Sequence, residues 1–185
     1  PPAIALFSAL LKGRGHSVDI FDSTYYQTDH GVDSDGTKAE RLNIIPFSSG
    51  EKGIQMRVTD WQEDIKNKLE VFQPGLIALS TTEDMWLLGT RLLEEIEGFI
   101  TRHKIPVIAG GVFPTFAPEL VINHRLMDMV CIGEGENAMI DLCERLDKGQ
   151  SYSDVTNLWI KQKNGGVVKN PISNPFDIDD SPIID

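Results

Sequence analysis

Short apolar runs alternate with amphipathic segments through the middle of this chain, and this alternation is the feature that most limits its fold. The runs at 75–80, 105–110 and 128–133 are continuous, which is typical of strands buried on both faces of a parallel sheet. The segments before, between and after them, such as 60–73, 85–103 and 136–149, have apolar residues at helical spacing and are expected to be helices. Strands and helices in this order predict an α/β fold, a flavodoxin-like (Rossmann-like) doubly wound parallel sheet.

The start of the chain predicts a helix and then a strand, with no strand in front of the helix. Gly13 and Gly15 favour the end of the helix, and 17–22 alternates as a strand does. A β-α-β unit begins with a strand, so we expect the first strand of the sheet to be missing and the chain to be truncated. We expect an intruding segment such as Leu42–Phe47, or a second copy of the chain, to fill the gap; direct pairing of the two halves is the alternative.

The chain is expected to consist of one domain and an appendage. We assign residues 1–150 to the α/β domain, within which 24–59 is a polar insert too long to be a simple connector. Residues 151–185 are assigned to a β-hairpin and a linker. The dipeptide Asn164-Gly165 lies between two strand-like runs, which is a strong hairpin signal, and the residues after it are rich in Pro and Asp.

Composition excludes several classes of partner. A formal charge of -11 argues against nucleic acid and anionic membrane surfaces, which select for clustered Lys and Arg. The sequence shows no signal peptide and no apolar run of membrane-spanning length, so a cytoplasmic location is expected. Cys131 and Cys143 each lie in an apolar run, and we expect buried thiols.

Three predicted strands end in unusual loops. Three hydroxyl residues follow the first, at 80–82, and glycines follow the other two, at 110–111 and at 133 and 135. In an open parallel sheet the ligand crevice lies at the carboxyl ends of the strands. Hydroxyl residues also cap helices, and glycines also make turns. Four glycines at one edge nevertheless favour a bulky, flat ligand.

The sequence lacks the common motifs for phosphate binding and catalysis. Neither G-x-x-x-x-G-K-[ST] nor a G-x-G-x-x-G that opens a helix occurs, and the carboxylates of Glu134 and Glu136 would repel a phosphate. The four histidines lack metal-ligand spacing, and Ser80 lacks the glycines of a nucleophile elbow. The residues therefore predict a binding domain, with no catalytic and no metal-ligating residue assigned.

The order of these loops resembles the N-terminal cobalamin-binding domain of cobalamin-dependent radical S-adenosylmethionine (SAM) enzymes, which include the magnesium-protoporphyrin monomethyl ester oxidative cyclase type. The most specific features are GG-x-x-P-T-F at 110–116 and I-G-E-G-E at 132–136. The likeness covers nearly the whole chain, and the hairpin and linker resemble those that come just before the radical SAM barrel.

The resemblance implies that cobalamin binds at the sheet edge, with the corrin ring over the carboxyl ends of the strands and the nucleotide tail in the edge of the sheet. Glycine would be needed there because a Cβ atom would occupy ligand space. The cofactor-binding residues that it implies are Ser80, Thr81, Thr82, Gly110, Gly111, Val112, Phe113, Pro114, Gly133, Glu134 and Gly135. The D-x-H-x-x-G motif of the methionine synthase type does not occur, which implies base-off cobalamin without a protein histidine ligand.

The function implied is a cobalamin-binding module of a larger radical SAM enzyme that carries out methyl transfer or oxidative cyclisation. The chain lacks a CxxxCxxC run, so SAM and the [4Fe–4S] cluster would belong to a C-terminal barrel beyond Asp185, and the chain alone is not expected to be catalytic. Two alternatives stay open. One is a domain of the same ancestry that has lost cobalamin and shapes a substrate channel; the other is a free-standing flavodoxin-like binding or response module.

Overall fold

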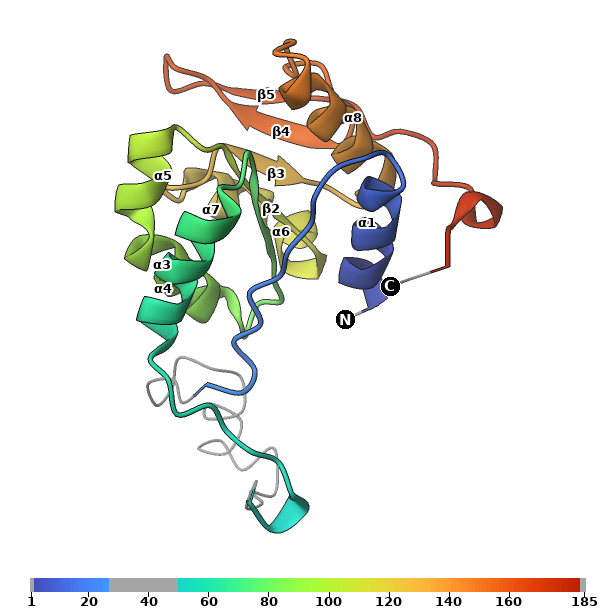
Figure 1. Ribbon diagram of the computed structural model, residues 1–185. Helices are drawn as coiled ribbons and strands as arrows, with labels where there is room; N and C mark the ends of the chain where they lie inside the picture. The colour runs from blue at the N-terminus through green and yellow to red at the C-terminus, as the bar shows by residue number, and fades with distance from the viewer. Residues whose placement is uncertain (1, 27–49, 184–185) are drawn as a thin grey trace. The chain divides into compact units, whose positions relative to one another are not determined.

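The computed structural model describes residues 2–26 and 50–183 (Figure 1). The chain divides into two compact units. The sheet unit consists of Pro1–Asp19, Pro74–Thr82 and Lys104–Asp185, and the helical unit of Ile20–Gln73 and Glu83–His103.

The sheet unit contains five strands in the order β1-β2-β3-β4-β5. The strands are β1 (Ile77–Ser80), β2 (Val107–Gly110), β3 (Met129–Cys131), β4 (Leu158–Lys161) and β5 (Val167–Lys169). The first three are parallel, β4 is antiparallel to β3, and β5 is antiparallel to β4. The predicted α/β fold is confirmed, and the predicted hairpin forms two further strands of the same sheet (Figure 1).

Four helices accompany the strands in the sheet unit: α1 (Pro2–Lys12), α6 (Val112–Phe116), α7 (Pro118–Asn123) and α8 (Glu136–Asp147). Helix α1 packs against α8, whereas α6 contacts β2 and β3 and α7 contacts β3 and β4. A 3₁₀ turn, η2 (Ile178–Asp180), follows in the C-terminal segment. The predicted helices at α1 and α8 are confirmed. The residues of α6 were predicted to form a loop, and this prediction is wrong.

One part of the core of the sheet unit lies between the central strands and α8. Its buried residues come from β2, β3, β4, α8 and the segment before β4: Ile108, Met129, Cys131, Ala138, Leu142, Val155, Leu158 and Ile160. Strands β2 and β3 are buried, as predicted for strands covered on both faces. The same prediction is wrong for β1, because Ala78 and Ser80 are exposed. β1 is an edge strand, so its apolar residues are only partly covered.

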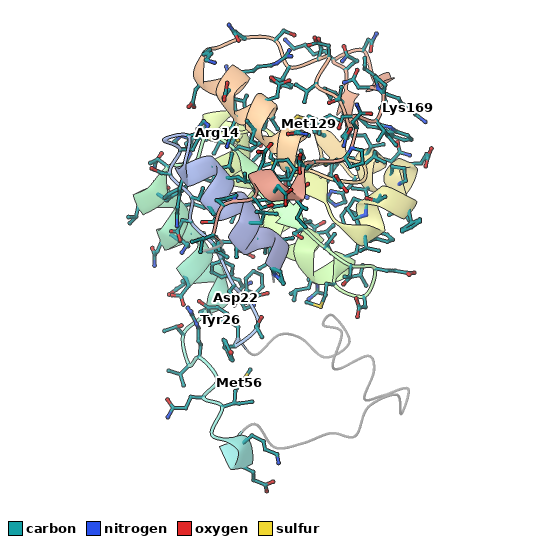
Figure 2. The ribbon with its side chains drawn as sticks, turned by 90° about the vertical axis from the view of Figure 1, so that its right-hand side faces the viewer. Arg14, Asp22, Tyr26, Met56, Met129 and Lys169 are labelled. Carbon is teal, nitrogen blue, oxygen red and sulfur yellow. The ribbon has the colours of Figure 1, made fainter. Side chains whose placement is uncertain are left out.

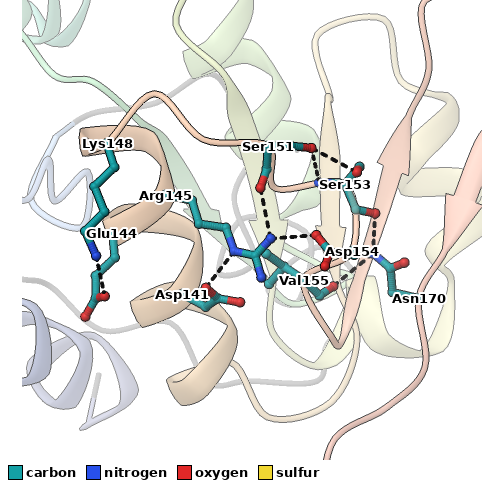
Figure 3. A network of polar contacts seen from close by, with 9 residues as sticks. All are labelled: Asp141, Glu144, Arg145, Lys148, Ser151, Ser153, Asp154, Val155 and Asn170. Atoms are coloured by element: carbon teal, nitrogen blue, oxygen red, sulfur yellow. Dashed lines mark hydrogen bonds and ion pairs between the residues drawn. The ribbon is translucent and has the colours of Figure 1, made fainter.

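Arg145 joins α8 to the loop that leads into β4 (Figure 3). Its guanidinium donates to Asp141 at 2.7 Å, to the carbonyl oxygen of Ser151 at 2.9 Å and to Asp154 at 2.5 Å. Asn170 holds the same loop from the other side, by donating to the carbonyl oxygens of Ser153 and Val155. These contacts fix the path by which the chain enters the antiparallel part of the sheet.

The helical unit contains α3 (Trp61–Phe72), α4 (Trp86–Glu95), α5 (Glu97–His103) and a 3₁₀ turn, η1 (Gly50–Lys52). Asp60 caps α3 by accepting a hydrogen bond from the Gln62 amide at 2.7 Å. A single helix was predicted where α4 and α5 occur, and this prediction is wrong. The helix breaks at Ile96, whose amide turns to the carbonyl oxygen of Leu93, three residues back.

Tyr26 is the buried centre of a polar cluster in the helical unit (Figure 2). Its hydroxyl donates to Asp64 at 2.7 Å and accepts from Arg57 at 2.9 Å. Thr59 donates to the same Asp64 oxygen at 2.6 Å. Burial and the hydrogen bond to Asp64 raise the pKa of Tyr26, and the bonds from Thr59 and Tyr26 lower the pKa of Asp64. The cluster connects the segment before residue 27 with the segment after residue 49.

The predicted strand at 17–22 does not form: these residues are extended, and they are not part of the five-stranded sheet that the described residues make. Alternation of apolar and polar residues produces a strand only where a neighbouring backbone completes the ladder, and Ile20 is instead 45% exposed. Direct pairing of the two halves is therefore not seen. Leu42–Phe47, the segment expected to fill the gap, lies outside the described residues.

Candidate functional site

The three loops predicted to form the site lie at one edge of the sheet. Ser80 at the end of β1 is the register partner of Gly110 at the end of β2. The Thr81 amide continues this pairing by donating to the carbonyl oxygen of Gly110 at 3.1 Å. The third loop is tied to the second, because the amide of Gly133 donates to the hydroxyl of Thr115 at 3.0 Å. Parallel strand order and these bonds bring the loops together.

In the glycine pair after β2, the backbone explains Gly111 but not Gly110. Gly111 has φ +109°, and a Cβ atom placed on it would lie 2.9 Å from the carbonyl oxygen of Thr81. A Cβ atom on Gly110 would meet only the Cβ of Cys131, at 3.6 Å, which is ordinary contact. We expected both glycines to leave room for a ligand. This reason is wrong for Gly111, because a side chain there would clash with the loop after β1.

The segment Gly133–Gly135, named here the GEG loop, contains glycines of two kinds. Gly133 has φ +73°, and a Cβ atom placed on it would meet nothing within 4 Å. A Cβ atom on Gly135 would lie 3.0 Å from Cζ of Phe7 in α1, so this glycine is needed for helix packing. Among the four glycines of the predicted site, Gly133 is the one beside open space.

The hydroxyl residues after β1 do not act as helix caps. Ser80 and Thr82 are exposed, whereas Thr81 is 5% exposed and its hydroxyl donates to the carbonyl oxygen of Thr82 at 2.9 Å. Helix α4 begins later, at Trp86, and its N-terminal residue Met85 makes no side-chain cap. The alternative interpretation, that these hydroxyl residues cap the following helix, is thus wrong.

The residues after Gly111 form the short helix α6. Val112 is 65% exposed, Phe113 is half-buried, and Pro114 is buried beneath them. Phe116, which was not predicted to belong to the site, is 84% exposed. The spacing of Val112 and Phe116, four residues apart, is the sequence signal that could have identified this exposed apolar surface.

Asn157 is a second residue that the sequence did not identify. It is 3% exposed, lies just before β4 and has φ +65°. Its side-chain amide donates to the carbonyl oxygen of Glu134 in the GEG loop at 2.6 Å. The carboxylate of Glu134 in turn accepts from the Phe176 amide at 2.7 Å. Asparagine is common at positive φ, but neither contact follows from sequence spacing.

A family comparison identifies the domain that contains these loops. Residues 51–142 match the family model described as the B12 binding domain. The matched segment contains β1, β2 and β3 and every loop of the site. Residues 51–142 belong to the B12-binding domain family. The B12-binding domain therefore has its three glycine and hydroxyl loops at the carboxyl ends of parallel strands, where ligands bind in open α/β sheets.

The B12-binding domain is similar to parts of longer enzymes. An uncharacterized methyltransferase of Pyrococcus horikoshii is 28% identical over 123 residues, which cover 65% of this chain and 26% of that protein. The cobalamin-dependent S-adenosylmethionine radical enzyme OxsB, with aqua-cobalamin and S-adenosylmethionine bound, is 26% identical with a TM-score of 0.54, over 66% of this chain and 17% of its own. The chain therefore spans a minor part of both.

One further structure shows the fold over most of the chain. The radical S-adenosylmethionine methyltransferase TsrM of Kitasatospora setae aligns with a TM-score of 0.63, over 92% of this chain and 27% of its own. At 17% identity this likeness concerns the fold alone. In the part of the chain that the structure describes, no helix is long and apolar enough to cross a membrane.

The residues at the edge of the B12-binding domain fit a large ligand that carries amide groups. Backbone at Gly133 is open, and Oε2 of Glu136 is buried without a hydrogen-bond partner among the described residues. A buried carboxylate oxygen without a partner costs free energy unless a donor from water or a ligand reaches it. The amides at the rim of a corrin are donors of this kind.

The thiols and histidines of the domain offer little chemistry. Burial, with a smaller effect from Glu136, raises the pKa of Cys131 to about 12, and burial with the charge of Asp147 raises that of Cys143 to about 11. Cys131 is buried as expected, and Cys143 is partly buried. Nδ1 of His16 lies 3.1 Å from Oδ2 of Asp147. The ring of His103 packs at a tilt against the ring of Phe99, and His124 is the C-cap residue of α7. Within residues 2–26 and 50–183, no cluster of three metal-ligating side chains occurs.

Proposed function

We propose that this chain binds cobalamin at the edge formed by the loops after β1, β2 and β3, and serves as the cofactor module of a larger radical SAM enzyme. The observation that carries the proposal is the match of residues 51–142 to the B12-binding domain family, on a sheet whose three site loops share one edge. Cobalamin would supply a cobalt centre that can carry a methyl group, and the residues of this chain would hold it in place.

Each loop has a different part in the proposed site. Ser80 and Thr82 offer exposed hydroxyls to the nucleotide tail, while the buried Thr81 forms the wall behind them. At Gly110 and Gly111 the backbone after β2 lies close to the backbone after β1, and this close approach positions the wall formed by Thr81. The remaining residues line the corrin side: Val112, Phe113 and Pro114 in α6, and Gly133, Glu134 and Gly135 in the GEG loop.

The state of the cofactor is a finer part of the proposal. Cobalamin would bind in its base-off form with no histidine of this chain on cobalt, because no D-x-H-x-x-G motif occurs in the sequence. The tail pocket would then hold the displaced nucleotide. An absorbance spectrum of the bound cofactor at neutral pH checks this, since the lower-ligand state of cobalt changes the visible bands.

The setting of the module is also proposed. A C-terminal radical SAM barrel would be its partner and would bring SAM and the [4Fe–4S] cluster, by analogy with the longer enzymes it resembles. Methyl transfer is favoured over oxidative cyclisation because one relative and one structural neighbour are methyltransferases by name. Residues 1–150 would be the cofactor domain and 151–185 the connection to the barrel. A cytoplasmic location suits the free thiols. A dimer of this chain is also proposed, and sedimentation velocity tests it.

Retention of the cofactor tests the proposed function. The purified chain is incubated with hydroxocobalamin, desalted, and its visible spectrum recorded. We expect one equivalent to stay with the protein. A colourless protein would instead support the alternative of a related domain that has lost cobalamin, and a flavin spectrum on purification would support a flavodoxin-like binder.

A further inference from the structure

The segment 171–177, named here the tail, touches the rest of the sheet unit at regular points. Ser173 and Phe176 are half-buried, whereas Ile172 is 69% exposed and Asn174 and Pro175 are also exposed. The amides of Ser173 and Phe176 are the two that donate to side chains outside the tail. An irregular exposed segment of this kind is ordered by few contacts, so these two bonds determine its path.

Asn157 is bonded to the tail and to the GEG loop at once. Its Oδ1 accepts from the Ser173 amide at 2.6 Å, and its Nδ2 donates to the carbonyl oxygen of Glu134 at 2.6 Å. Its backbone amide donates to the carbonyl oxygen of Pro171 at 2.9 Å, and its carbonyl accepts from Ile132 at 2.8 Å. Because the side chain is 3% exposed, water cannot replace these partners at low cost.

Glu134 makes the second connection. Its backbone carbonyl is held by Asn157, and its carboxylate accepts from the Phe176 amide at 2.7 Å. Hydrogen bonds from backbone amides to carboxylates are stronger than those to neutral acceptors. The loop and the tail are therefore joined at two points, and a movement of Glu134 displaces both acceptors that the tail uses.

We propose that Asn157 and Glu134 are positioning residues, a latch that couples the GEG loop to the tail, so that cobalamin bound at the loop orders residues 171–177. This coupling rests on the proposed function, because it needs cobalamin beside the loop. Thermodynamic linkage makes this coupling reciprocal. A ligand that stabilises the latched loop also stabilises the tail, and breaking the latch lowers the affinity for the ligand by the same factor. The carboxylate of Glu134 then binds the tail, and it is the backbone of Glu134 that lines the corrin side.

The latch itself is tested without any ligand. Amide hydrogen exchange is measured by NMR on the labelled chain and on Glu134→Ala, which changes an exposed side chain and should leave the fold intact. We expect exchange of the Phe176 amide to become about five- to tenfold faster, as for the loss of one hydrogen bond. Glu144→Ala is the matched control, since the carboxylate of Glu144 in α8 pairs with Lys148, the residue after the helix, and with Arg14, but not with the tail. Equal exchange at Phe176 in the parent and Glu134→Ala would overturn the latch.

The coupling is tested with a second pair of variants. Asn157→Asp keeps an oxygen for the Ser173 amide but places another against the carbonyl oxygen of Glu134, so it breaks the loop side of the latch. Asn170→Asp is the matched control, because Asn170 donates to Ser153 and Val155 and not to the GEG loop (Figure 3).

Hydroxocobalamin should slow exchange at Ser173 and Phe176 in the parent and in Asn170→Asp. In Asn157→Asp it should leave the Ser173 amide unchanged, whereas the Phe176 amide keeps its bond to Glu134 and should still exchange more slowly. The dissociation constant of Asn157→Asp should rise by the same factor by which the Ser173 amide is protected in the parent. Tight binding with no change in tail exchange would refute the coupling while the proposed function stands. Failure to bind cobalamin at all would refute the proposed function and the coupling together, while the exchange of the free chain would still decide whether the latch exists.

Discussion

The carbonyl oxygen of Thr81 lies 2.9 Å from the point that a Cβ atom on Gly111 would occupy. This contact joins the loops after β1 and β2 at the edge where the cofactor is proposed to bind. Gly111 also has a positive φ, so any other residue there is strained in its own backbone as well as against Thr81.

Gly111→Ala is therefore expected to lower the free energy of unfolding by about 2–3 kcal/mol, from backbone strain and the clash together. Gly110→Ala should cost less than about 1 kcal/mol, because its Cβ would make ordinary contact with Cys131. Urea unfolding followed by circular dichroism measures both. Equal losses for the two variants would show that the backbone of Gly111 does not need glycine.

Tyr26→Phe should destabilise the helical unit by about 1 kcal/mol, the net worth of a hydrogen bond between uncharged and charged partners. The hydroxyl of Tyr26 is bonded on both sides, to Asp64 and to Arg57. Tyr25→Phe is the control, since that side chain is exposed. Urea midpoints compare the two variants, and an unchanged midpoint for Tyr26→Phe would mean that Arg57 and Asp64 pair equally well without the hydroxyl.

Asp64 should make stability depend on pH on the acidic side. Hydrogen bonds from Thr59 and Tyr26 lower its pKa in the folded state, so its contribution is complete above the ordinary carboxyl pKa and is lost as the pH falls through the lowered one. Unfolding midpoints measured between about pH 5 and pH 2 should fall more steeply for the parent than for Asp64→Asn. Parallel curves would contradict this role.

Both thiols should react slowly while the chain is folded. Burial raises the pKa of Cys131 to about 12 and that of Cys143 to about 11, so little thiolate is present at pH 8. Ellman's reagent should modify both cysteines rapidly in urea and neither rapidly in buffer, with Cys143 the faster of the two. Rapid modification of Cys131 in the folded chain would show that β3 is open to solvent.

The sequence predicted the parts of this fold that are set by burial. Runs such as 105–110 are apolar without interruption because both faces of β2 are covered, and α3 begins at a capping Asp60 and ends before Pro74. Because parallel strands end at one edge, the juxtaposition of Ser80 and Gly110 also followed from the order of elements.

The errors concern features that depend on neighbours distant in sequence. Residues 17–22 have the pattern of a strand but lie outside the sheet that the described residues make. Helix α6 is a single turn with Pro114 inside it, which propensity does not predict, and the break at Ile96 has neither Gly nor Pro to mark it. Asn157 connects residues 134 and 173, which no local pattern brings together.

The central claim is that cobalamin lies against the GEG loop, and a pair of glycine variants tests it most directly. Gly133 and Gly149 both have positive φ and both face open space, so Gly133→Leu and Gly149→Leu carry similar backbone strain. Gly133 is in the GEG loop, whereas Gly149 follows α8. Equilibrium dialysis against hydroxocobalamin should show binding by the parent and Gly149→Leu, and at least a tenfold weaker affinity, about 1.4 kcal/mol, for Gly133→Leu. Equal affinity of the two variants would contradict the placement of cobalamin at this loop.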